Sequence, residues 1–381
     1  MDSSSAAASR HSSETPTAIP QVSIIVPARN EEASLGECLQ SLISQAGVTF
    51  EIIVVDDGST DRTREIAQSF STVQVISAEP LHGDLSGKNW TGKSNALVCG
   101  GKAARAEWLL FTDADTVHRP GSLARAVAEA KHEHADLLSY SPEQVVVTFA
   151  ERTVMPVIFA ELAAQYPPHK VRAQNSEVVA ANGQYILVRR DAYEAVGGHA
   201  AIADEILEDV ALARLFRNAR YRVYFRYGGD SVRTRMYRSW PQVREGWTKN
   251  LALLFPHAGR LALRSILVWF AAWLALGIVA FGLSAHHFLW ILAAAVWLVV
   301  YRRIQVAHFA VGNNLLAIAI GLPIFSYLLL RSKNAHANGR VFWKGRTYEL
   351  RAPAIMPARA QSSETPLRLG KAEKRELRTE N

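Results

Sequence analysis

The stretch WLLFTDADTV, residues 108–117, constrains the fold most, because a short apolar run ends abruptly at two carboxylates. Such a run is typical of a buried parallel strand. Asp113 and Asp115 follow it directly, with the small Ala114 between them. Side chains at i and i+2 of an extended backbone point the same way, so both carboxylates can converge on one ligand at the carboxyl end of the strand, where open α/β sheets bind ligands. The alternative is a polar turn with an Asp at a helix N-cap.

Two converging carboxylates repel each other unless a cation lies between them. Mg²⁺ and Mn²⁺ suit this arrangement, because they take one or two protein carboxylates and fill their other positions with water and phosphate oxygens. We therefore expect Asp113 and Asp115 to hold Mg²⁺ or Mn²⁺.

Strands alternate with helices in the first part of the chain. Strand patterns lie at 22–27, 51–55 and 73–76, each followed by a helix or a loop leading to one. This order predicts an α/β fold with a doubly wound, mainly parallel sheet. Asp56 and Asp57 end the second strand, so a second acidic corner faces the same sheet edge as the first. Lys93 lies near the start of a helix, where free N–H groups and its charge suit phosphate; a solvated loop lysine is the alternative.

The remaining elements of this part follow less regular patterns. We expect a helix at 120–132, strands around 137–140 and 145–147, and a helix at 149–168 that is either buried or interfacial. A strand pair with a short helix is expected at 178–198, a helix at 203–219, a strand at 221–229 and an amphipathic helix at 239–255. Glu205, Glu208 and Asp209 fall in the first turn of the 203–219 helix, where acids often serve only the helix dipole.

Charge is partitioned sharply along the chain. Residues 1–255 carry a net charge of −4, residues 256–330 hold four Arg and no acid, and the tail from Arg331 carries +7. The excess positive charge therefore lies on and after apolar segments, which favours a membrane surface and not nucleic acid as the partner. Cys38 and Cys99 lie in apolar helical contexts and are expected to be core thiols in a reducing compartment.

The apolar segments predict a membrane region. Ser265 to Ala285 is 21 residues without a charge, long enough to cross about 30 Å of hydrocarbon. A shorter second span is expected at 286–303, and a third segment at 309–330 either spans or re-enters. Arg302 and Arg303 after the second segment place the catalytic domain in the cytoplasm by the positive-inside rule. A third crossing would put the +7 tail outside, so we favour a re-entrant hairpin broken near Pro323.

These patterns divide the chain into four parts. Residues 1–20 form a disordered leader and 21–255 an α/β catalytic domain ending in an amphipathic helix. Residues 256–333 form the membrane region, and 334–381 a basic tail. The sequence predicts a multi-pass protein of a bacterial-type inner or plasma membrane.

Six segments occur in a set order: SIIVPARNEE, VVDDGSTD, GKSNAL, LLFTDADT, NGQYILVRRDAYEAVGG and EILEDVALARLFR. Together they strongly resemble the family 2 glycosyltransferases with their GT-A fold, over about residues 22–255. The later pieces MYRSW, EGWTKN and WKGRTYEL are similar to the membrane-bound branch that glycosylates lipids, such as the carotenoid, hopanoid-associated and ceramide glycosyltransferases.

The resemblance implies a role for each matching residue. The nucleotide-sugar site would use Pro27, Ala28, Asn30, Glu31, Asp56 or Asp57, Lys93 and Asp113, and the metal site Asp113 and Asp115. Asp209 matches the general base, with Glu208 as the less favoured alternative. The family often carries Q-x-x-R-W, but here Gln242 is followed by Arg244 and Trp247, and a second set, Arg235, Arg238 and Trp240, lies just upstream. Arg346 is a further candidate near the diphosphate.

The implied function is transfer of a sugar from a nucleotide-diphosphate sugar, UDP-hexose in our expectation, to a membrane lipid of isoprenoid, hopanoid or sphingolipid type, with inversion. A carboxylate base, a metal and a lysine suit the chemistry of such a transfer. Two alternatives stay open. One is a processive polysaccharide synthase, for which two or three apolar segments are few; the other is a non-catalytic protein that binds sugar nucleotides or lipids.

Overall fold

The computed structural model describes residues 19–79, 90–281, 287–343 and 346–349. Most of the predicted leader and most of the predicted basic tail lie outside these residues.

A seven-stranded sheet forms the centre of the catalytic domain, in the order β3-β2-β1-β4-β8-β6-β9. Its strands are β1 (Val22–Ala28), β2 (Phe50–Asp56), β3 (Val73–Ser77), β4 (Trp108–Phe111), β6 (Leu137–Ser141), β8 (Ile186–Arg189) and β9 (Val223–Tyr227). All neighbours pair in parallel except β8, which is antiparallel to both β4 and β6. The predicted α/β fold with a doubly wound, mainly parallel sheet is confirmed.

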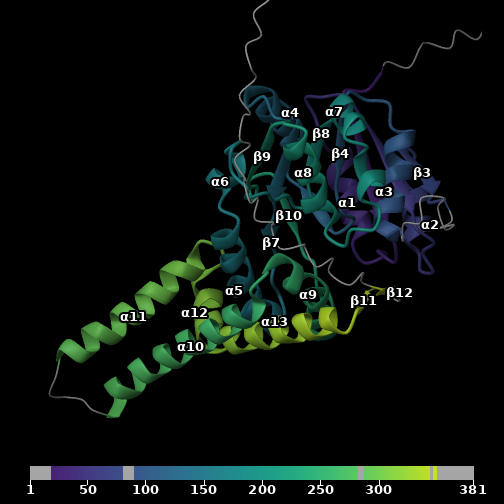
Figure 1. The fold of residues 1–381 in the computed structure, drawn as a ribbon. Helices are drawn as coiled ribbons and strands as arrows, with labels where there is room; N and C mark the ends of the chain where they lie inside the picture. Colours follow the sequence, from purple (N-terminus) through teal and green to yellow (C-terminus); the bar gives the residue numbers. More distant parts are fainter. Residues whose placement is uncertain (1–18, 80–89, 282–286, 344–345, 350–381) are drawn as a thin grey trace, which may run out of the picture.

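Helices cover both faces of this sheet (Figure 1). One face packs against α1 (Leu35–Ile43) and α4 (Ser122–His132); the other packs against α3 (Gly92–Ala103), α7 (Arg190–Ala195) and α8 (Glu208–Asn218). Neighbouring residues of β1 show the alternation, because Ile24 is buried in the first core and Ile25 in the second. A strand covered on both faces must be apolar at consecutive positions, which explains its continuous run. Helix α2 (Thr63–Gln68) follows β2, and Cys38 and Cys99 are buried free thiols as predicted.

Two predicted strands differ in the structure. Residues 145–147 are not a strand; the strand is β7 (Glu143–Gln144), which forms a small sheet with β10 (Val232–Thr234) and β5 (Thr116–His118). The N–H groups of Val147 and Thr148 donate instead to the Glu151 carboxylate, at 3.3 and 2.7 Å, as part of a helix capping box. Backbone donors used by a cap cannot join a strand ladder.

The predicted strand pair at 178–189 is only one strand, β8. In the loop before β8, backbone N–H groups donate to side chains and not to a neighbouring strand. Asn182 N donates to Ser139 Oγ at 2.8 Å, and Gly183 N donates to Asp209 Oδ2 at 2.9 Å. Shorter elements are α6 (Pro168–Arg172) and the 3₁₀ turn η1 (Gly198–Ile202), with a separate hairpin of β11 (Arg340–Trp343) and β12 (Arg346–Glu349).

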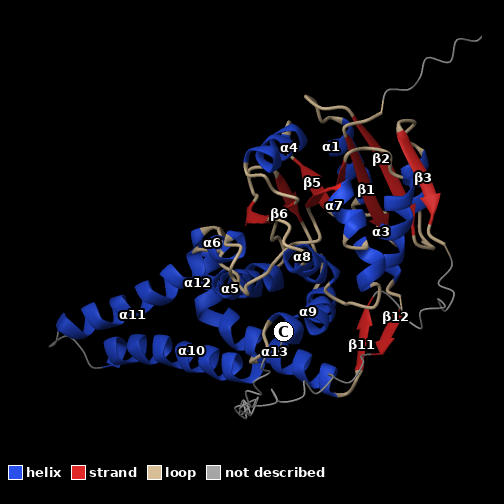
Figure 2. Ribbon diagram, turned by 45° about the horizontal axis from the view of Figure 1, so that its top comes forward, coloured by secondary structure: helices blue, strands red, loops and turns tan. Residues whose placement is uncertain are grey.

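A third core joins the catalytic domain to the C-terminal helices. Its helices are α5 (Phe149–Gln165), α9 (Trp240–Leu254), α10 (Ala258–Phe281), α11 (His287–Gln305), the π turn η2 (Ala317–Gly321) and α13 (Leu322–Ala337). The short helix α12 (Val311–Leu316) leads into η2. Val154 and Ile158 of α5 are fully buried, so α5 is a core helix. Figure 2 shows α10 and α11 projecting away from the red sheet strands as a hairpin.

Among the described residues, two helical segments are long and apolar enough to cross a bilayer, Ala258–Ala280 and Val311–Ala337. The second corrects our expectation of a break near Pro323, because helix runs on through this residue. Pro323 follows the π turn 317–321 and is the second residue of α13. Proline has no N–H to donate to the preceding turn of a helix. The π turn before Pro323 accommodates this lost hydrogen bond without ending the helix.

Candidate active site

A cavity of about 1030 Å³ lies at the carboxyl ends of β1, β2 and β4. Twelve of the predicted site residues line it: Pro27, Ala28, Asn30, Glu31, Asp57, Lys93, Asp113, Asp115, Glu208, Asp209, Arg238 and Trp247. Asp56, Arg244 and Trp240 are not in its lining, and the side chain of Arg346 lies outside the described part of the structure. The fold therefore brings most of the sequence-predicted residues to one place.

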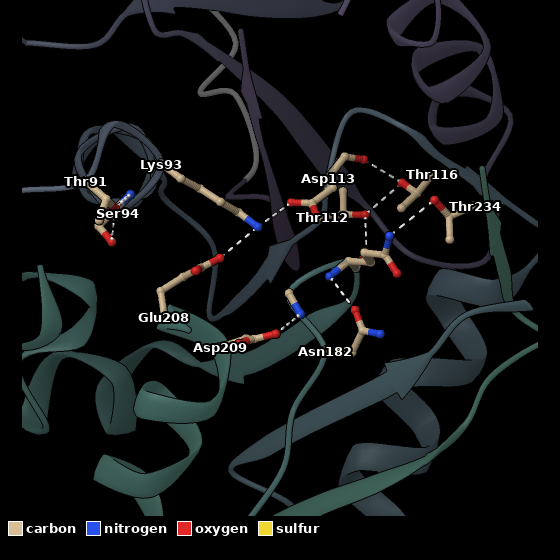
Figure 3. Close-up of polar contacts among 12 residues, drawn as sticks. Thr91, Lys93, Ser94, Thr112, Asp113, Thr116, Asn182, Glu208, Asp209 and Thr234 are labelled. Atoms are coloured by element: carbon tan, nitrogen blue, oxygen red, sulfur yellow. Dashed lines mark hydrogen bonds and ion pairs between the residues drawn. The ribbon is translucent and has the colours of Figure 1, made fainter. Parts of the chain in front are cut away.

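The turn carrying Asp113 is fixed by hydroxyl groups on both sides of it (Figure 3). Thr112, buried at the end of β4, donates to the Gln184 carbonyl oxygen at 2.8 Å. Thr116, at the start of β5, donates to the Asp113 carbonyl oxygen at 2.7 Å. These bonds tie the acidic turn to the loop before β8, so the Asp113 side chain is presented from a held backbone.

Lys93 joins two acidic elements. It lies in the first turn of α3, which Thr91 caps by accepting from Ser94 N at 3.1 Å. Its Nζ is 2.8 Å from Asp113 Oδ1 and 2.8 Å from Glu208 Oε1, as Figure 3 shows.

These contacts shift the three groups differently. Burial alone would lower the pKa of Lys93, but Asp113 and Glu208 outweigh it and raise that pKa well above its usual value. Burial would raise the pKa of Glu208, but Lys93 and then Lys249 lower it. Burial raises the pKa of Asp113; Lys93 opposes this shift, and the charges of Glu208 and Glu31 add to it. Lys93 and Glu208 therefore form a charged pair across the cavity.

Asp209 has a different environment from its neighbour Glu208. Its Oδ2 accepts from Gly183 N at 2.9 Å and its Oδ1 from Val210 N at 2.8 Å. Burial and then the charge of Glu208 raise the pKa of Asp209 to about 6. A carboxylate with a pKa near 6 is ionised at neutral pH and still basic enough to take a proton.

The first loop and the end of β2 form the other end of the cavity. Asp57 lines the cavity, whereas Asp56 is turned into the fold, where its Oδ1 accepts from Ser59 N at 3.1 Å. Asn30 Oδ1 accepts from Thr60 N at 2.9 Å, and Asn30 has a φ of +52°. The two loops therefore hold each other, and of the two candidate acids the geometry presents Asp57.

The structure also separates the two Arg and Trp sets. Trp247 is buried against Met155, with Nε1 3.3 Å from Sδ, and lines the cavity. Arg238 lines it too, and its Nη2 donates to the Ala33 carbonyl oxygen at 3.1 Å. Trp240 instead lines a separate apolar groove with Phe149. Two members of each predicted set thus reach the cavity, Gln242 and Trp247 of one and Arg235 and Arg238 of the other.

Among the lining residues without a role assigned from the sequence, two contact or face the charged cluster. Lys249 is half-buried, burial lowers its pKa, and the charge of Glu208 opposes this shift most. Gly183 is the second: a Cβ built there would lie 3.1 Å from Lys93 Nζ and 3.4 Å from Glu208 Oε1. Lys249 is the lysine of EGWTKN and Gly183 the glycine of NGQYIL, so both were visible in the motifs without a stated partner.

The residues present fit a divalent ion shared with a diphosphate. Asp113 and Asp115 both line the cavity, and carboxylate oxygens suit Mg²⁺ and Mn²⁺. The described residues contain no cluster of three or more His, Cys, Asp or Glu side chains placed to hold a metal. The protein would therefore supply only one or two ligands, which is the usual arrangement for Mg²⁺ bound with phosphate oxygens.

Comparison with known proteins agrees with this site. Residues 23–197 match the family model described as glycosyl transferase family 2. The chain is 29% identical over 344 residues to the 4,4'-diaponeurosporenoate glycosyltransferase of Staphylococcus aureus strain USA300, covering 86% of this chain and 88% of that protein.

Two solved structures are similar at low identity. The mannosyltransferase PcManGT from Pyrobaculum calidifontis, in complex with GDP-Man and Mn²⁺, is 18% identical with a TM-score of 0.47, over 84% of this chain and 88% of its own. S. aureus TarS 1-349 in complex with UDP-GlcNAc is 17% identical with a TM-score of 0.40, over 88% of this chain and 97% of its own. On these findings, residues 23–197 carry a glycosyl transferase family 2 domain, and the chain is similar to a curated glycosyltransferase over most of its length.

Proposed function

We propose that this enzyme transfers a hexose from a UDP-sugar to a membrane lipid acceptor, with inversion at the anomeric carbon. One observation carries the proposal: a single cavity holds the Lys93, Asp113 and Glu208 cluster beside Asp209 and continues along the apolar helix α5. The first part suits a nucleotide diphosphate, and the second suits a hydrocarbon chain.

The donor half of the cavity supports a nucleoside diphosphate. Asp57 and Asn30 lie at the nucleoside end, and Asp57 would accept hydrogen bonds from a uracil ring. Asp113 and Asp115 would hold Mg²⁺ or Mn²⁺, which supplies positive charge to the diphosphate when bound. Lys93 lies 2.8 Å from Asp113 and adds a second positive charge on the same side.

The chemistry follows from the position of Asp209. Asp209 takes the proton of an acceptor hydroxyl while that oxygen attacks the anomeric carbon from the face opposite the diphosphate. The bond from the anomeric carbon to the diphosphate oxygen breaks, and the nucleoside diphosphate leaves with the electron pair. Lys93 stabilises the charge that grows on it. Glu208 is less suited as the base, because its carboxylate is already paired with Lys93 at 2.8 Å.

The acceptor half is apolar and wide. Ala160, Ala163 and Ala164 of α5 line it at positions that share one helix face. Small side chains on that face leave the space open. Residues 306–308, in the connection between α11 and α12, also line the cavity. A volume of about 1030 Å³ is at the upper end of the roughly 300–1,000 Å³ typical of small-molecule sites, which fits a donor and part of an acceptor together.

The similar protein from S. aureus, named for a carotenoid acid, supports an acceptor of this lipid class. The exposed apolar side chains of α10 and α11, such as Leu267, Phe270 and Ile291, support membrane association. Arg302 and Arg303 at the end of α11 support a cytoplasmic catalytic domain.

The test uses membranes from cells expressing the full chain, incubated with radiolabelled UDP-glucose and Mn²⁺. We expect label in the organic-solvent extract, and its loss in Asp209→Asn. Asp191→Asn is the matched control, because Asp191 lies on the surface, paired with Arg189 at 2.6 Å, and outside the cavity lining. Label only in a long polymer, or equal labelling by Asp209→Asn, would contradict the proposal.

A further inference from the structure

The chain returns to the catalytic domain after the α10–α11 hairpin. Arg303, near the end of α11, lies with Nη2 2.9 Å from Glu161 Oε2 of α5. The ring of His308 stacks on Tyr227 at the end of β9, with centroids 4.1 Å apart and planes 13° apart. Whatever depth the hairpin reaches in a bilayer, residue 308 is therefore on the same side of it as the sheet.

The helical segment 311–337 then contacts the catalytic domain at both of its ends. At its start, Asn313 Oδ1 accepts from Arg152 Nε at 2.9 Å, and Arg152 is an exposed, charged residue in the first turn of α5. At its end, Ser332 Oγ donates to the Thr248 carbonyl oxygen at 2.7 Å. His336 Nε2 lies 2.8 Å from the Lys249 carbonyl oxygen, also on α9.

The middle of the segment also packs against other helices of the protein, α5 and α10. A Cβ built on Gly321 would lie 2.2 Å from the Thr153 carbonyl oxygen, so the backbones of η2 and α5 are in close contact. Ser326 Oγ donates to the Ala262 carbonyl oxygen of α10 at 3.0 Å. A spanning helix has its two ends on opposite sides of about 30 Å of hydrocarbon. Contacts with one domain at the start, the middle and the end do not allow that separation.

The face of the 311–337 segment that does not contact α5, α9 or α10 is apolar and exposed. Val311, Leu315, Ile320, Tyr327 and Leu330 are between 39% and 60% exposed. Phe149, at the start of α5, is 63% exposed beside them, and an apolar groove lies between it and Tyr327. Helix α10 of the hairpin packs on the same segment, since Trp269 Nε1 donates to the Ala319 carbonyl oxygen at 2.8 Å, and no acidic residue occurs between Glu245 and Glu349. These are the features of a helix lying in a membrane interface.

We propose that the 311–337 helix lies in the plane of the bilayer surface, with its exposed apolar face against lipid, and does not cross. The basic residues at the end of this helix and just after it, Arg331, Lys333 and Arg340, then stay on the catalytic side, where anionic headgroups attract them. The same placement sets residues 306–308, which line the acceptor half of the cavity, at the membrane surface. The inference rests on the membrane association included in the proposed function.

Spin labels measure the depth of this helix directly. Single cysteines replace Leu315, Ile320, Tyr327 and Leu330 in the full chain, which is reconstituted in vesicles of phosphatidylethanolamine and phosphatidylglycerol. Residues 315 and 330 are about 22 Å apart along a helix axis, so a spanning helix would give label depths that differ by about 20 Å and pass through the bilayer centre. We expect all four depths to be shallow and to agree within about 5 Å. A range near 20 Å, or labels without lipid contact, would overturn the proposal.

A second measurement fixes the side of the C-terminal end. Asn334→Cys, at the exposed end of α13, and His132→Cys, on the sheet domain, are treated with a membrane-impermeant maleimide in intact cells and in inverted vesicles. The unchanged chain is the control, because Cys38 and Cys99 are buried. We expect both cysteines to react from the same side; reaction from opposite sides would mean a third crossing. Sugar transfer is assayed on the same preparations, so its loss with unchanged labelling counts against the proposed function alone.

Discussion

The backbone N–H of Gly183 donates to the Asp209 carboxylate at 2.9 Å, in the loop just before β8. This contact orients one oxygen of Asp209 and leaves the carboxylate beside Glu208 rather than paired with Lys93. The two adjacent acids at the start of α8 therefore have different partners, because Glu208 is paired with Lys93. In the proposed mechanism this leaves Asp209 to accept the proton.

The first prediction concerns pH. Burial and the charge of Glu208 raise the pKa of Asp209 to about 6, and only the ionised form accepts a proton. Transfer should therefore fall about tenfold per pH unit below 6 and level off above it. In Glu208→Gln the midpoint should move to lower pH, because the charge that raises the pKa of Asp209 is gone. The profile of kcat against pH measures both; an unchanged midpoint in this variant would argue against Asp209 as the base.

The second prediction concerns Gly183. In Gly183→Ala the new methyl group would lie 3.1 Å from Lys93 Nζ, so Lys93 must shift away from Asp113 or Glu208. We expect kcat to fall about tenfold, equal to about 1.4 kcal/mol, with little change in thermal stability. Gly36→Ala is the matched control, because its Cβ would meet only Ile66 Cγ2 at 3.8 Å. Equal activity of the two variants would mean that the position of Lys93 does not matter.

The third prediction concerns the metal. Treatment with a chelator should abolish transfer, and Mn²⁺ or Mg²⁺ should restore it. Asp115→Asn removes one of two expected carboxylate ligands, so it should raise the Mn²⁺ concentration for half-maximal activity by about ten- to a hundredfold. Isothermal titration of Mn²⁺ in the presence of UDP gives an independent readout. Unchanged Mn²⁺ affinity in Asp115→Asn would remove Asp115 from the metal site.

The sequence was most informative where the structure depends on local pattern. The apolar run 108–111 followed by Asp113 and Asp115 was enough to predict a buried strand ending at a ligand site, because burial on both faces requires consecutive apolar residues. The prediction that Asp56 and Asp57, at the end of β2, lie at the same sheet edge as Asp113 needed only the parallel pairing of the strands. The choice between Asp56 and Asp57 required the structure, because it depends on which of the two carboxylates accepts the hydrogen bond from Ser59 N.

What could not be predicted depends on contacts between distant segments. Gly183 matters through Lys93 and Asp209, which lie far from it in the sequence. The break expected near Pro323 is absent, because the π turn before it keeps the helix continuous against Thr153 of α5. Lys249 enters the site only because α9 packs beside α5 in the third core. These contacts join segments that are distant in the sequence, so no local sequence pattern predicts them.

The fourth prediction concerns Glu161, which joins the hairpin to the catalytic domain. Its carboxylate on α5 is buried and pairs with Arg264 of α10 and Arg303 of α11. Glu161→Gln leaves both arginines without their partner, and since each is about half exposed, the free energy of unfolding should fall by only about 1–2 kcal/mol. Thermal unfolding in detergent measures this. Glu37→Gln, which breaks an exposed pair with Arg233, should change stability by less than about 0.5 kcal/mol.

The last prediction concerns the acceptor half of the cavity. Ala163 and Ala164 of α5 line it, and Ala164 is exposed, so a larger side chain fits there without unfolding the helix. In Ala163→Trp and Ala164→Trp the indole should fill the space meant for the acceptor chain, lowering transfer to lipid at least about tenfold. Binding of UDP should stay unchanged, because the donor end of the cavity is untouched. Ala275→Trp on α10 is the control, since Ala275 is outside the cavity lining. If the two α5 variants transfer sugar to lipid as well as this control does, the acceptor chain does not lie along α5.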